Sequence, residues 1–263
     1  MPCSLDSRLD VAKRLRLTPM IRYAMELEQD VTTANLSHAE YLAKLLHCEC
    51  ERRDEEALKR RLQQANFRYA DACIARVDWN ADRQINRSLL DTLTSNDYIR
   101  FHQNVIITGA TGCGKSWLAD ALGHTACLAG FRVKHNRVAQ MLKEYERLCT
   151  ENTSVGRRQY LSSLGKLDLL ILDDWGIGQL DDDKRFSLHE IIENHMQHGS
   201  FIVTSVLPVK QWNEYLNDAL MADSILDRLS LNSHRLLLQG NSMRSRPEYG
   251  GLPKNDTKVQ GLN

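Results

Sequence analysis

One glycine-rich run holds the residue types that bind phosphate groups. It comprises Gly109, Ala110, Thr111, Gly112, Cys113, Gly114, Lys115 and Ser116. The glycines allow consecutive backbone N–H groups to point at phosphate oxygens, and a helix that follows offers its positive N-terminus. We expect Lys115 to reach the β- and γ-phosphates and Ser116 to bind Mg²⁺, with Trp117 completing the nucleotide-binding residues. The run therefore predicts a site for a nucleoside triphosphate with Mg²⁺.

Two adjacent acids, Asp173 and Asp174, end an apolar run at residues 169–172. In a phosphate-binding protein we expect Asp173 to hold Mg²⁺ through its water shell, and Asp174 to orient or deprotonate the attacking water. The second acid favours hydrolysis over transfer of the phosphoryl group to another molecule. Because Asp is about one methylene shorter than Glu, we expect slow hydrolysis. A core strand closed by an acidic turn is the alternative.

The sequence favours ATP as the nucleotide. Nothing in it resembles the NKxD element with which GTPases read guanine. Adenine is expected to contact apolar residues just before the first strand, with Trp79 and Ile85 as candidates. Lys115 and Asp174 are thus predicted catalytic residues of an ATPase.

The glycine-rich run requires a strand before it and a helix after it. Apolar residues 104–108 predict the strand, and residues 117–122 predict the helix. Further strands are predicted at 131–135, 167–172 and 201–205, and they alternate with helices at 138–149, 157–164 and 185–197. Such alternation predicts a parallel sheet covered on both faces.

The first 75 or so residues show helical patterns only. Thr18-Pro19 suits a helix start, and Ser37 and Glu40 have the spacing of a capping box. The apolar residues that follow at helical spacing are Tyr41, Leu42, Leu45 and Leu46. We predict a helical domain at residues 1–75, an ATPase domain at 76–246 and a disordered tail at 247–263.

Composition sets loose limits on partners and compartment. The 263-residue chain has 34 basic and 34 acidic residues, so its net charge neither requires nor excludes a polyanionic partner. Its seven cysteines include no CxxC pair, and its first residues lack an apolar signal core. No run approaches the roughly 20 apolar residues that span a bilayer. We expect a soluble, cytoplasmic protein with no membrane contact.

The order of the motifs resembles AAA+ ATPases. In detail it is similar to the IstB and DnaC-type group, the ATP-binding helpers of insertion-sequence transposition and the loaders of replicative helicase. The similar stretches, within residues 10–245, are LRLTPM, GATGCGKS, DLLILDDWG, IVTSVLPVKQW and ILDRLSLNSHRLLLQGNSMR. The last two point more narrowly to IstB. The resemblance implies an α/β fold, a P-loop AAA+ domain with a five-stranded parallel sheet, preceded by a small all-α domain.

The resemblance also implies roles for two arginines and for one strand end. Arg228 is implied as an arginine finger that reaches the γ-phosphate held by a neighbouring subunit, which requires a homo-oligomer, either ring or helical. Arg244 is implied as a second nucleotide sensor. An ordinary surface arginine is the alternative at both positions. Val206 stands where the family usually has a polar sensor, so either Thr204 or Ser205 replaces it or hydrolysis is weakened.

A protein of this group is expected to contact duplex DNA through phosphates without reading base sequence. The candidate basic residues are Arg52, Arg53, Lys59, Arg60, Arg61, Lys134, Arg137, Arg157 and Arg158. Acidic residues between positions 51 and 56 neighbour the candidates at 52–61. For these five candidates, a solvated helix face with paired charges is at least as good an interpretation as a DNA-binding surface.

Two groups of possible metal ligands are not interpreted as metal sites. Adjacent positions of a helix point in different directions, so we do not expect residues 47–50 (His-Cys-Glu-Cys) to converge on a metal ion. His189, His195 and His198 lack a carboxylate or Cys partner at ligand spacing, and we expect them at the surface.

The leading hypothesis is a DNA-dependent ATPase that oligomerises on duplex DNA with ATP and assists or regulates a transposase. A helicase loader of the DnaC type is the alternative within the group. A nucleotide-switched binding module with little turnover is a further alternative, because Val206 cannot hydrogen-bond. A small-molecule kinase is a third, against which Asp174 and the Arg228 segment argue. We expect the helical first part to bind a partner or neighbouring subunits.

Overall fold

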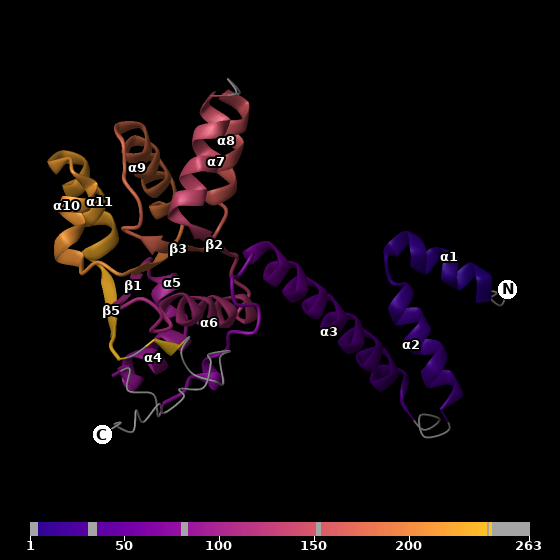
Figure 1. The fold of residues 1–263 in the computed structure, drawn as a ribbon. Coiled ribbons are helices and arrows are strands. Elements are labelled where there is room, and N and C mark those ends of the chain that lie inside the picture. The colour runs from indigo at the N-terminus through magenta and orange to yellow at the C-terminus, as the bar shows by residue number, and fades with distance from the viewer. Residues whose placement is uncertain (1–4, 31–35, 80–83, 151–153, 241, 244–263) are drawn as a thin grey trace, which may run out of the picture. The chain divides into compact units, whose positions relative to one another are not determined.

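The structure, a computed structural model, describes residues 5–30, 36–79, 84–150, 154–240 and 242–243 (Figure 1). The chain divides into two compact units, Met1–Arg60 and Arg61–Asn263. Helix α3 (His38–Ala65) begins in the first unit and ends in the second. None of the helices in the described ranges is both long enough and apolar enough to cross a bilayer. The predicted tail at 247–263 lies outside the described residues.

The first unit consists of α1 (Leu5–Leu15), α2 (Thr18–Gln29) and most of α3. Helix α2 has Pro19 in its first turn, as predicted. The predicted capping box of α3 is confirmed, since Ser37 N donates to Glu40 Oε2 (2.9 Å) and Glu40 N donates to Ser37 Oγ (3.3 Å). Leu42 and Leu46 are half exposed, so the apolar face of α3 is narrower than predicted. The buried cluster of this unit consists of Ala24, Leu27 and Leu45.

The second unit is built on a five-stranded parallel sheet with the strand order β2-β3-β4-β1-β5, which confirms the predicted sheet. Its strands are β1 (Asn104–Gly109), β2 (Val133–Arg137), β3 (Leu169–Trp175), β4 (Ser200–Ser205) and β5 (Ser233–Leu238). Because all pairings are parallel, the carboxyl ends of β1, β3 and β4 meet at one edge. The glycine-rich run, the two adjacent acids and Thr204 lie at these three strand ends.

Helices cover both faces of this sheet (Figure 1). One face carries α6 (Lys115–Leu128), against which α4 (Arg87–Thr94) packs, and α5 (Asp97–Arg100) leads into β1. The other face carries α7 (Val138–Thr150), α8 (Ser154–Leu164), α9 (Asp182–Met196), α10 (Trp212–Leu216) and α11 (Ala219–Ser230). Two 3₁₀ helices, η2 (Ile74–Arg76) and η3 (Val209–Gln211), lie in connections.

One hydrophobic core of the second unit lies between the sheet and the layer that contains α7, α9 and α11. Residues 169–173 of β3 are all buried, as expected for a central parallel strand covered on both faces. Burying one large apolar side chain contributes about 1.5–3 kcal/mol. The largest fully buried side chains of this core include Tyr145, Trp175, Phe201 and Trp212. This packing fixes the end of β3, where Asp173 lies.

The prediction that three histidines lie at the surface is wrong for His195. Its ring is fully buried on the inner face of α9, with Nδ1 3.0 Å from Leu164 O and Nε2 3.1 Å from Ser200 O. Burial lowers the pKa of His195 and favours the neutral ring, which donates from one nitrogen to one of these two carbonyls. His189 is half-buried and contacts Ser224 Oγ at 2.9 Å, whereas His198 is exposed.

Candidate nucleotide-binding site

The glycine-rich run forms a tight loop between β1 and α6, and backbone geometry explains its glycines. Gly109, Gly112 and Gly114 have φ angles of 151°, 82° and 96°, which side-chain-bearing residues rarely adopt. A Cβ at Gly109 would lie 2.2 Å from Leu238 O on the neighbouring strand β5. The first glycine is therefore required both by conformation and by the close approach of β5.

Lys115 begins α6 and is folded back over the loop. Its Nζ donates to Gly109 O (2.9 Å) and to Ala110 O (2.8 Å), and the residue is largely buried. The ammonium therefore lies over the loop that precedes the positive N-terminus of α6. An anion placed there would meet the ammonium and the helix N-terminus together.

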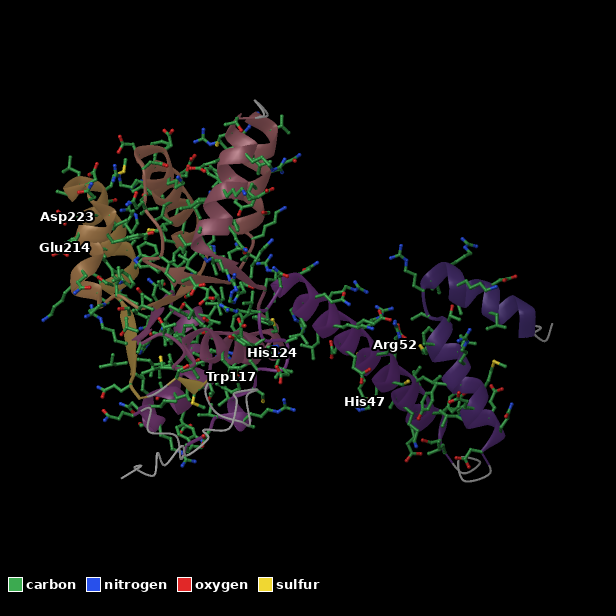
Figure 2. The ribbon with its side chains drawn as sticks, viewed as in Figure 1. His47, Arg52, Trp117, His124, Glu214 and Asp223 are labelled. Atoms are coloured by element: carbon green, nitrogen blue, oxygen red, sulfur yellow. The ribbon has the colours of Figure 1, made fainter. Side chains whose placement is uncertain are left out.

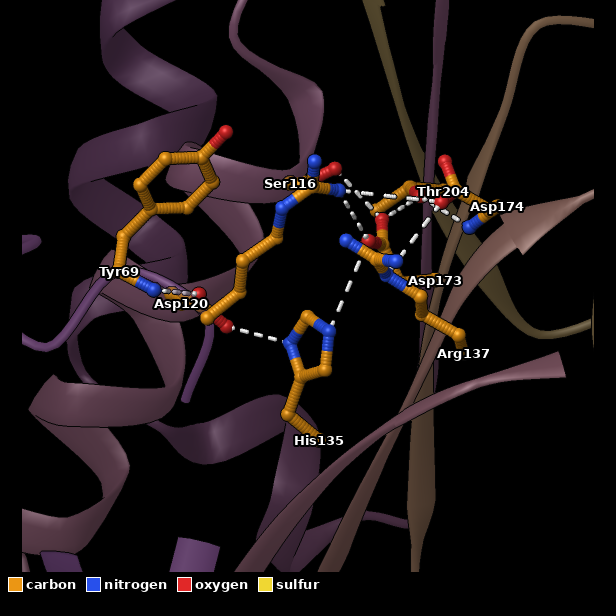
Figure 3. Close-up of polar contacts among 9 residues, drawn as sticks. Tyr69, Ser116, Asp120, His135, Arg137, Asp173, Asp174 and Thr204 are labelled. Atoms are coloured by element: carbon orange, nitrogen blue, oxygen red, sulfur yellow. Dashed lines mark hydrogen bonds and ion pairs between the residues drawn. The ribbon is translucent and has the colours of Figure 1, made fainter. Parts of the chain in front are cut away.

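Asp173 is the centre of the polar contacts at the end of β3 (Figure 3). Its Oδ1 accepts from Ser116 Oγ (2.6 Å) and from Thr204 Oγ1 (2.5 Å). Burial raises the pKa of this carboxyl, but the nearby charge of His135 and hydrogen bonds from Ser116 and Thr204 outweigh burial and hold it well below the ordinary value. An ionised carboxylate beside a hydroxyl is a hard oxygen donor set, so Ser116 and Asp173 fit Mg²⁺.

The contacts at the end of β4 distinguish Thr204 from Ser205, the two candidates for the polar sensor. The sequence alone left this choice open. Thr204 Oγ1 contacts Asp173 and accepts from Asp174 N at 3.2 Å. Ser205 instead donates to the backbone oxygen of Trp175 (2.8 Å), the last residue of β3. Of the two hydroxyls, the structure places that of Thr204 at the site, while Val206 lines the cavity described below.

Asp174 follows Asp173 in a left-handed backbone conformation. Its φ is 61°, at a point where the register between β3 and β4 shifts. Such a conformation costs a residue other than glycine about 1–2 kcal/mol, though Asp tolerates it better than most. It turns the partly exposed carboxylate toward Arg68 Nη1 and Arg137 Nε, each 3.8 Å from Oδ2. Asp174 also lines the cavity.

A cavity of about 320 Å³ lies beside the loop. This volume is at the lower end of the range of about 300–1,000 Å³ typical of small-molecule sites. Its lining includes the predicted residues Thr111, Gly112, Gly114, Lys115, Ser116, Trp117 and Asp174. It also includes residues that the sequence did not suggest, namely Arg68, Tyr69, Asp71, Arg76, Ile177 and Met243. The adenine candidates Trp79 and Ile85 are not in this lining, and the Trp79 ring instead lies 4.8 Å from Arg87 Cζ.

A buried polar chain leads away from Asp173 (Figure 3). His135 Nε2 lies 3.6 Å from Asp173 Oδ2, and His135 Nδ1 lies 2.6 Å from Asp120 Oδ1. Asp120 Oδ2 in turn accepts from Tyr69 N at 2.9 Å. Burial lowers the pKa of His135, but the hydrogen bond to Asp120 and the nearby charge of Asp173 outweigh it and raise the pKa to about 9. A protonated His135 thus balances two buried carboxylates.

The implied arginine finger, Arg228, does not contact the phosphate loop of its own chain. Arg228, on α11, donates from Nη1 to Ser224 O (2.8 Å), and its Nη2 lies 2.5 Å from Glu193 Oε2 on α9. It is not among the residues that line this chain's cavity. Arg244 lies outside the described residues. The chain reaches the loop just before it, since Met243 N donates to Gly112 O at 2.8 Å.

Most of the candidate DNA-binding arginines have acidic partners. Arg52 projects from α3 (Figure 2). It pairs with Glu49 and Glu56, while Arg53 pairs with Glu49 and Arg60 with Glu56. Arg157 contacts Glu190, and Arg137 faces Asp174. A separate groove of about 720 Å³ is lined by four basic residues and by no acid: Arg61, Arg132, Arg158 and Lys166.

Comparison with known sequences finds relatives that are named for insertion sequences. Residues 10–249 match the family described as IstB-like ATP binding protein. An insertion sequence ATP-binding protein of Sinorhizobium fredii is 39% identical over 90% of this chain and 94% of its own length. The IS1162 ATP-binding protein of Pseudomonas fluorescens is also 39% identical, over 74% of this chain and 83% of its own length.

Solved structures show the same fold at low sequence identity. DnaI superposes with a TM-score of 0.52 at 19% identity, over 64% of this chain and 91% of that one. A primosome component from Streptococcus pyogenes gives a TM-score of 0.51 at 18% identity, over 72% and 98%. The sheet order and the phosphate loop are those of P-loop AAA+ domains. With 240 consecutive residues matched, the chain belongs to the IstB-like ATP-binding protein family.

Proposed function

We propose that this chain binds and hydrolyses ATP with Mg²⁺, assembles with copies of itself on duplex DNA, and assists or regulates the transposase of an insertion sequence. One observation carries the hydrolytic part: Ser116, Asp173 and Asp174 lie together beside the phosphate loop. Membership of the IstB-like family supports ATP as the nucleotide. The names of the relatives support the insertion-sequence setting.

Each residue of the site has a separate proposed role in hydrolysis. Lys115 and the loop N–H groups bind phosphate oxygens. Ser116 and Asp173 would hold Mg²⁺, which when bound offsets negative charge on the phosphates. Asp174 faces the cavity and accepts the proton of the attacking water or orients that water. Thr204 fixes Asp173 and the backbone of Asp174 through its hydroxyl.

Arg228 is proposed to complete the site of a neighbouring copy. Within its own chain it is bound to Glu193 and is about one-quarter exposed. A guanidinium stabilises the charge of a transferring phosphoryl group only when it contacts that group. Assembly must therefore let Arg228 exchange Glu193 for the neighbour's phosphate. This requirement links hydrolysis to oligomer formation.

The groove lined by Arg61, Arg132, Arg158 and Lys166 is proposed as a contact surface for the DNA backbone. Arg132 is paired with Asp168 at 3.0 Å, but the groove lining itself contains no acidic side chain. Basic side chains that contact phosphates bind duplex DNA without reading its sequence. This surface is a better candidate than the α3 face, whose arginines are paired with Glu49 and Glu56.

A nucleotide-switched binding module with little turnover is the second candidate. It is favoured by Val206, which lines the cavity but has no group to bind phosphate or water. The two candidates differ in turnover, whereas both require nucleotide binding.

The deciding experiment measures ATP turnover by the full chain with and without duplex DNA, with particle size followed in parallel. We expect turnover that DNA stimulates, assembly that requires both ATP and DNA, and loss of turnover in Lys115→Ala and Arg228→Ala. Turnover that ignores DNA and persists in Arg228→Ala would rule out the shared site. DNA-dependent assembly with negligible turnover would establish the binding module instead.

A further inference from the structure

Arg68 lines the cavity and contacts both acids at the end of β3. Its Nη1 lies 3.4 Å from Asp173 Oδ2 and 3.8 Å from Asp174 Oδ2. It lines the same cavity as Lys115 and Ser116 and is about one-quarter exposed. Arg137 also lies 3.8 Å from Asp174 Oδ2, but it is not among the residues that line the cavity. Within the described part of the chain, Arg68 thus adds a cation from the cavity wall beside the residues that are proposed to handle the terminal phosphate.

The position of Arg68 is set by buried contacts of its neighbour. Tyr69 N donates to Asp120 Oδ2 (2.9 Å), and Asp120 Oδ1 lies 2.6 Å from His135 Nδ1. Asp120 and His135 are both buried. This anchor ties the segment after α3 to α6 and β2, the two elements next to the site. The guanidinium of Arg68 therefore extends into the cavity from a fixed backbone.

The present partners of Arg68 leave its guanidinium able to change acceptors. Charge-assisted N–H···O bonds are typically about 2.7–2.9 Å long, and both carboxylate distances of Arg68 exceed that range. Asp173 already accepts from Ser116 and Thr204. If Asp173 and Ser116 held Mg²⁺, that cation would compete with Arg68 for Asp173. A γ-phosphate beside Asp174 offers oxygens that a planar guanidinium binds well.

We propose that Arg68 is a phosphate-binding residue of the nucleotide site, acting within its own chain and making the site favour a nucleoside triphosphate over a diphosphate. The proposal rests on the proposed nucleotide-binding function. Arg68 adjoins the acids at the γ-phosphate end, so its contribution is selective for that phosphate. Arg68 thus acts within one chain, whereas Arg228 is proposed to act on a neighbour.

The test compares binding of fluorescent methylanthraniloyl derivatives of ATP and ADP to the full chain, with Mg²⁺, for the wild type, Arg68→Gln and Arg68→Lys. We expect Arg68→Gln to weaken ATP binding about tenfold or more, since a charged hydrogen bond is lost, and to leave ADP binding nearly unchanged. Arg68→Lys keeps the charge and should recover part of the ATP affinity. The control is Arg100→Gln, which removes an arginine paired with Asp97 at 2.6 Å on α5.

Equal losses of ATP and ADP affinity in Arg68→Gln would overturn the proposal and make Arg68 a structural residue of the cavity wall. Tighter ATP binding in Arg68→Gln would also overturn it, because Arg68 would then be a counter-ion that competes with nucleotide. Thermal unfolding of each variant separates these results from misfolding, and Arg68→Lys repeats the comparison if Arg68→Gln does not fold. A wild type that binds ATP selectively without hydrolysing it would refute the proposed ATPase but not the role of Arg68.

Discussion

Thr204 donates a hydrogen bond to Asp173 across 2.5 Å and joins the end of β4 to the end of β3. The same hydroxyl accepts from the backbone N–H of Asp174 at 3.2 Å. One side chain therefore holds both acids of the site in place. This arrangement gives Thr204 a positioning role. Val206, which stands where the family usually has a polar sensor, has no side-chain group that could take this role.

Replacing Thr204 with Val should lower ATP turnover about 10- to 100-fold, the usual cost of removing a residue that orients a metal ligand. The isosteric side chain fills the same space but neither donates to Asp173 nor accepts from Asp174 N. Turnover measured against Mg²⁺ concentration should shift to higher Mg²⁺. Thr204→Ser keeps the hydroxyl and is expected to retain most activity. Equal ATP turnover in Thr204→Val and Thr204→Ser would show that the Thr204 hydroxyl has no positioning role.

Asp174→Asn should abolish most hydrolysis while ATP binding is retained. The amide cannot accept a proton from water, and loss of a general base typically costs about 10²–10⁴-fold in rate. Asp174→Glu restores a carboxylate one methylene longer and should turn over ATP faster than Asp174→Asn. Single-turnover hydrolysis and nucleotide binding, measured on the same preparations, check both variants. Wild-type rates in Asp174→Asn would mean that another group activates the water.

Gly109→Ala should destabilise the fold and prevent nucleotide binding. Its Cβ would meet Leu238 O at 2.2 Å at a φ of 151°, and forcing atoms into packed space costs about 1–3 kcal/mol. Gly130→Ala is the matched control, because Gly130 also has a positive φ (97°) but a Cβ there would meet nothing within 4 Å. Gly130→Ala should lower the free energy of unfolding only by the backbone penalty of about 1–2 kcal/mol. Urea unfolding of both variants gives the comparison, and equal losses would show that the contact with β5 is unimportant.

The sequence was sufficient for the parts of the site that one motif or one strand end defines. The glycine-rich loop, the two acids at the end of β3 and four of the five parallel strands each have a local pattern. The fifth strand, β5, was implied only by the resemblance to AAA+ ATPases. The choice between Thr204 and Ser205 has no such pattern, because β4 is buried on both faces and alternation carries no information there. Only the contact with Asp173 separates the two hydroxyls.

Other parts of the site depend on contacts between distant residues. Arg68 and Tyr69 follow the end of α3 without any motif, and they reach the cavity through the contact between Tyr69 N and Asp120. Asp120 and His135 are polar residues within buried stretches, a signal that could have marked them. The surface prediction fails for His195 because the partners of a buried imidazole can be backbone carbonyls, which no side-chain spacing reveals.

The stability of the first unit should fall in acid through Glu49. The hydrogen bond from Arg52 lowers the pKa of Glu49 from 4.5 to about 2, with burial opposing and Arg53 assisting. Because the folded-state pKa is depressed, the stabilisation is present above pH 4.5 and is lost as the pH falls toward 2. Glu49→Gln should lower the free energy of unfolding by on the order of 1–2 kcal/mol at neutral pH. The stability of this variant should also change less as the pH falls from 4.5 toward 2. Circular dichroism melts at several pH values measure this.

Glu55→Gln is the control for that profile, since Glu55 is an exposed acid on the same helix. It should keep the wild-type dependence on pH. If Glu49→Gln and Glu55→Gln melt alike at every pH, the ion pairs of Glu49 contribute nothing measurable, as is common for exposed pairs.

Loss of one basic side chain from the groove should weaken DNA binding by a similar factor on every sequence. Arg158→Ala and Lys166→Ala each remove one phosphate contact, so the slope of log affinity against log salt should fall in magnitude by about 1. Arg147→Ala is the matched control, because Arg147 pairs with Glu144 on α7 and does not line the groove. Fluorescence anisotropy with two unrelated duplexes, at several salt concentrations and with ATP present, provides the measurement. Unchanged slopes in both groove variants would place the DNA on another face, and a loss confined to one duplex would contradict binding through the backbone.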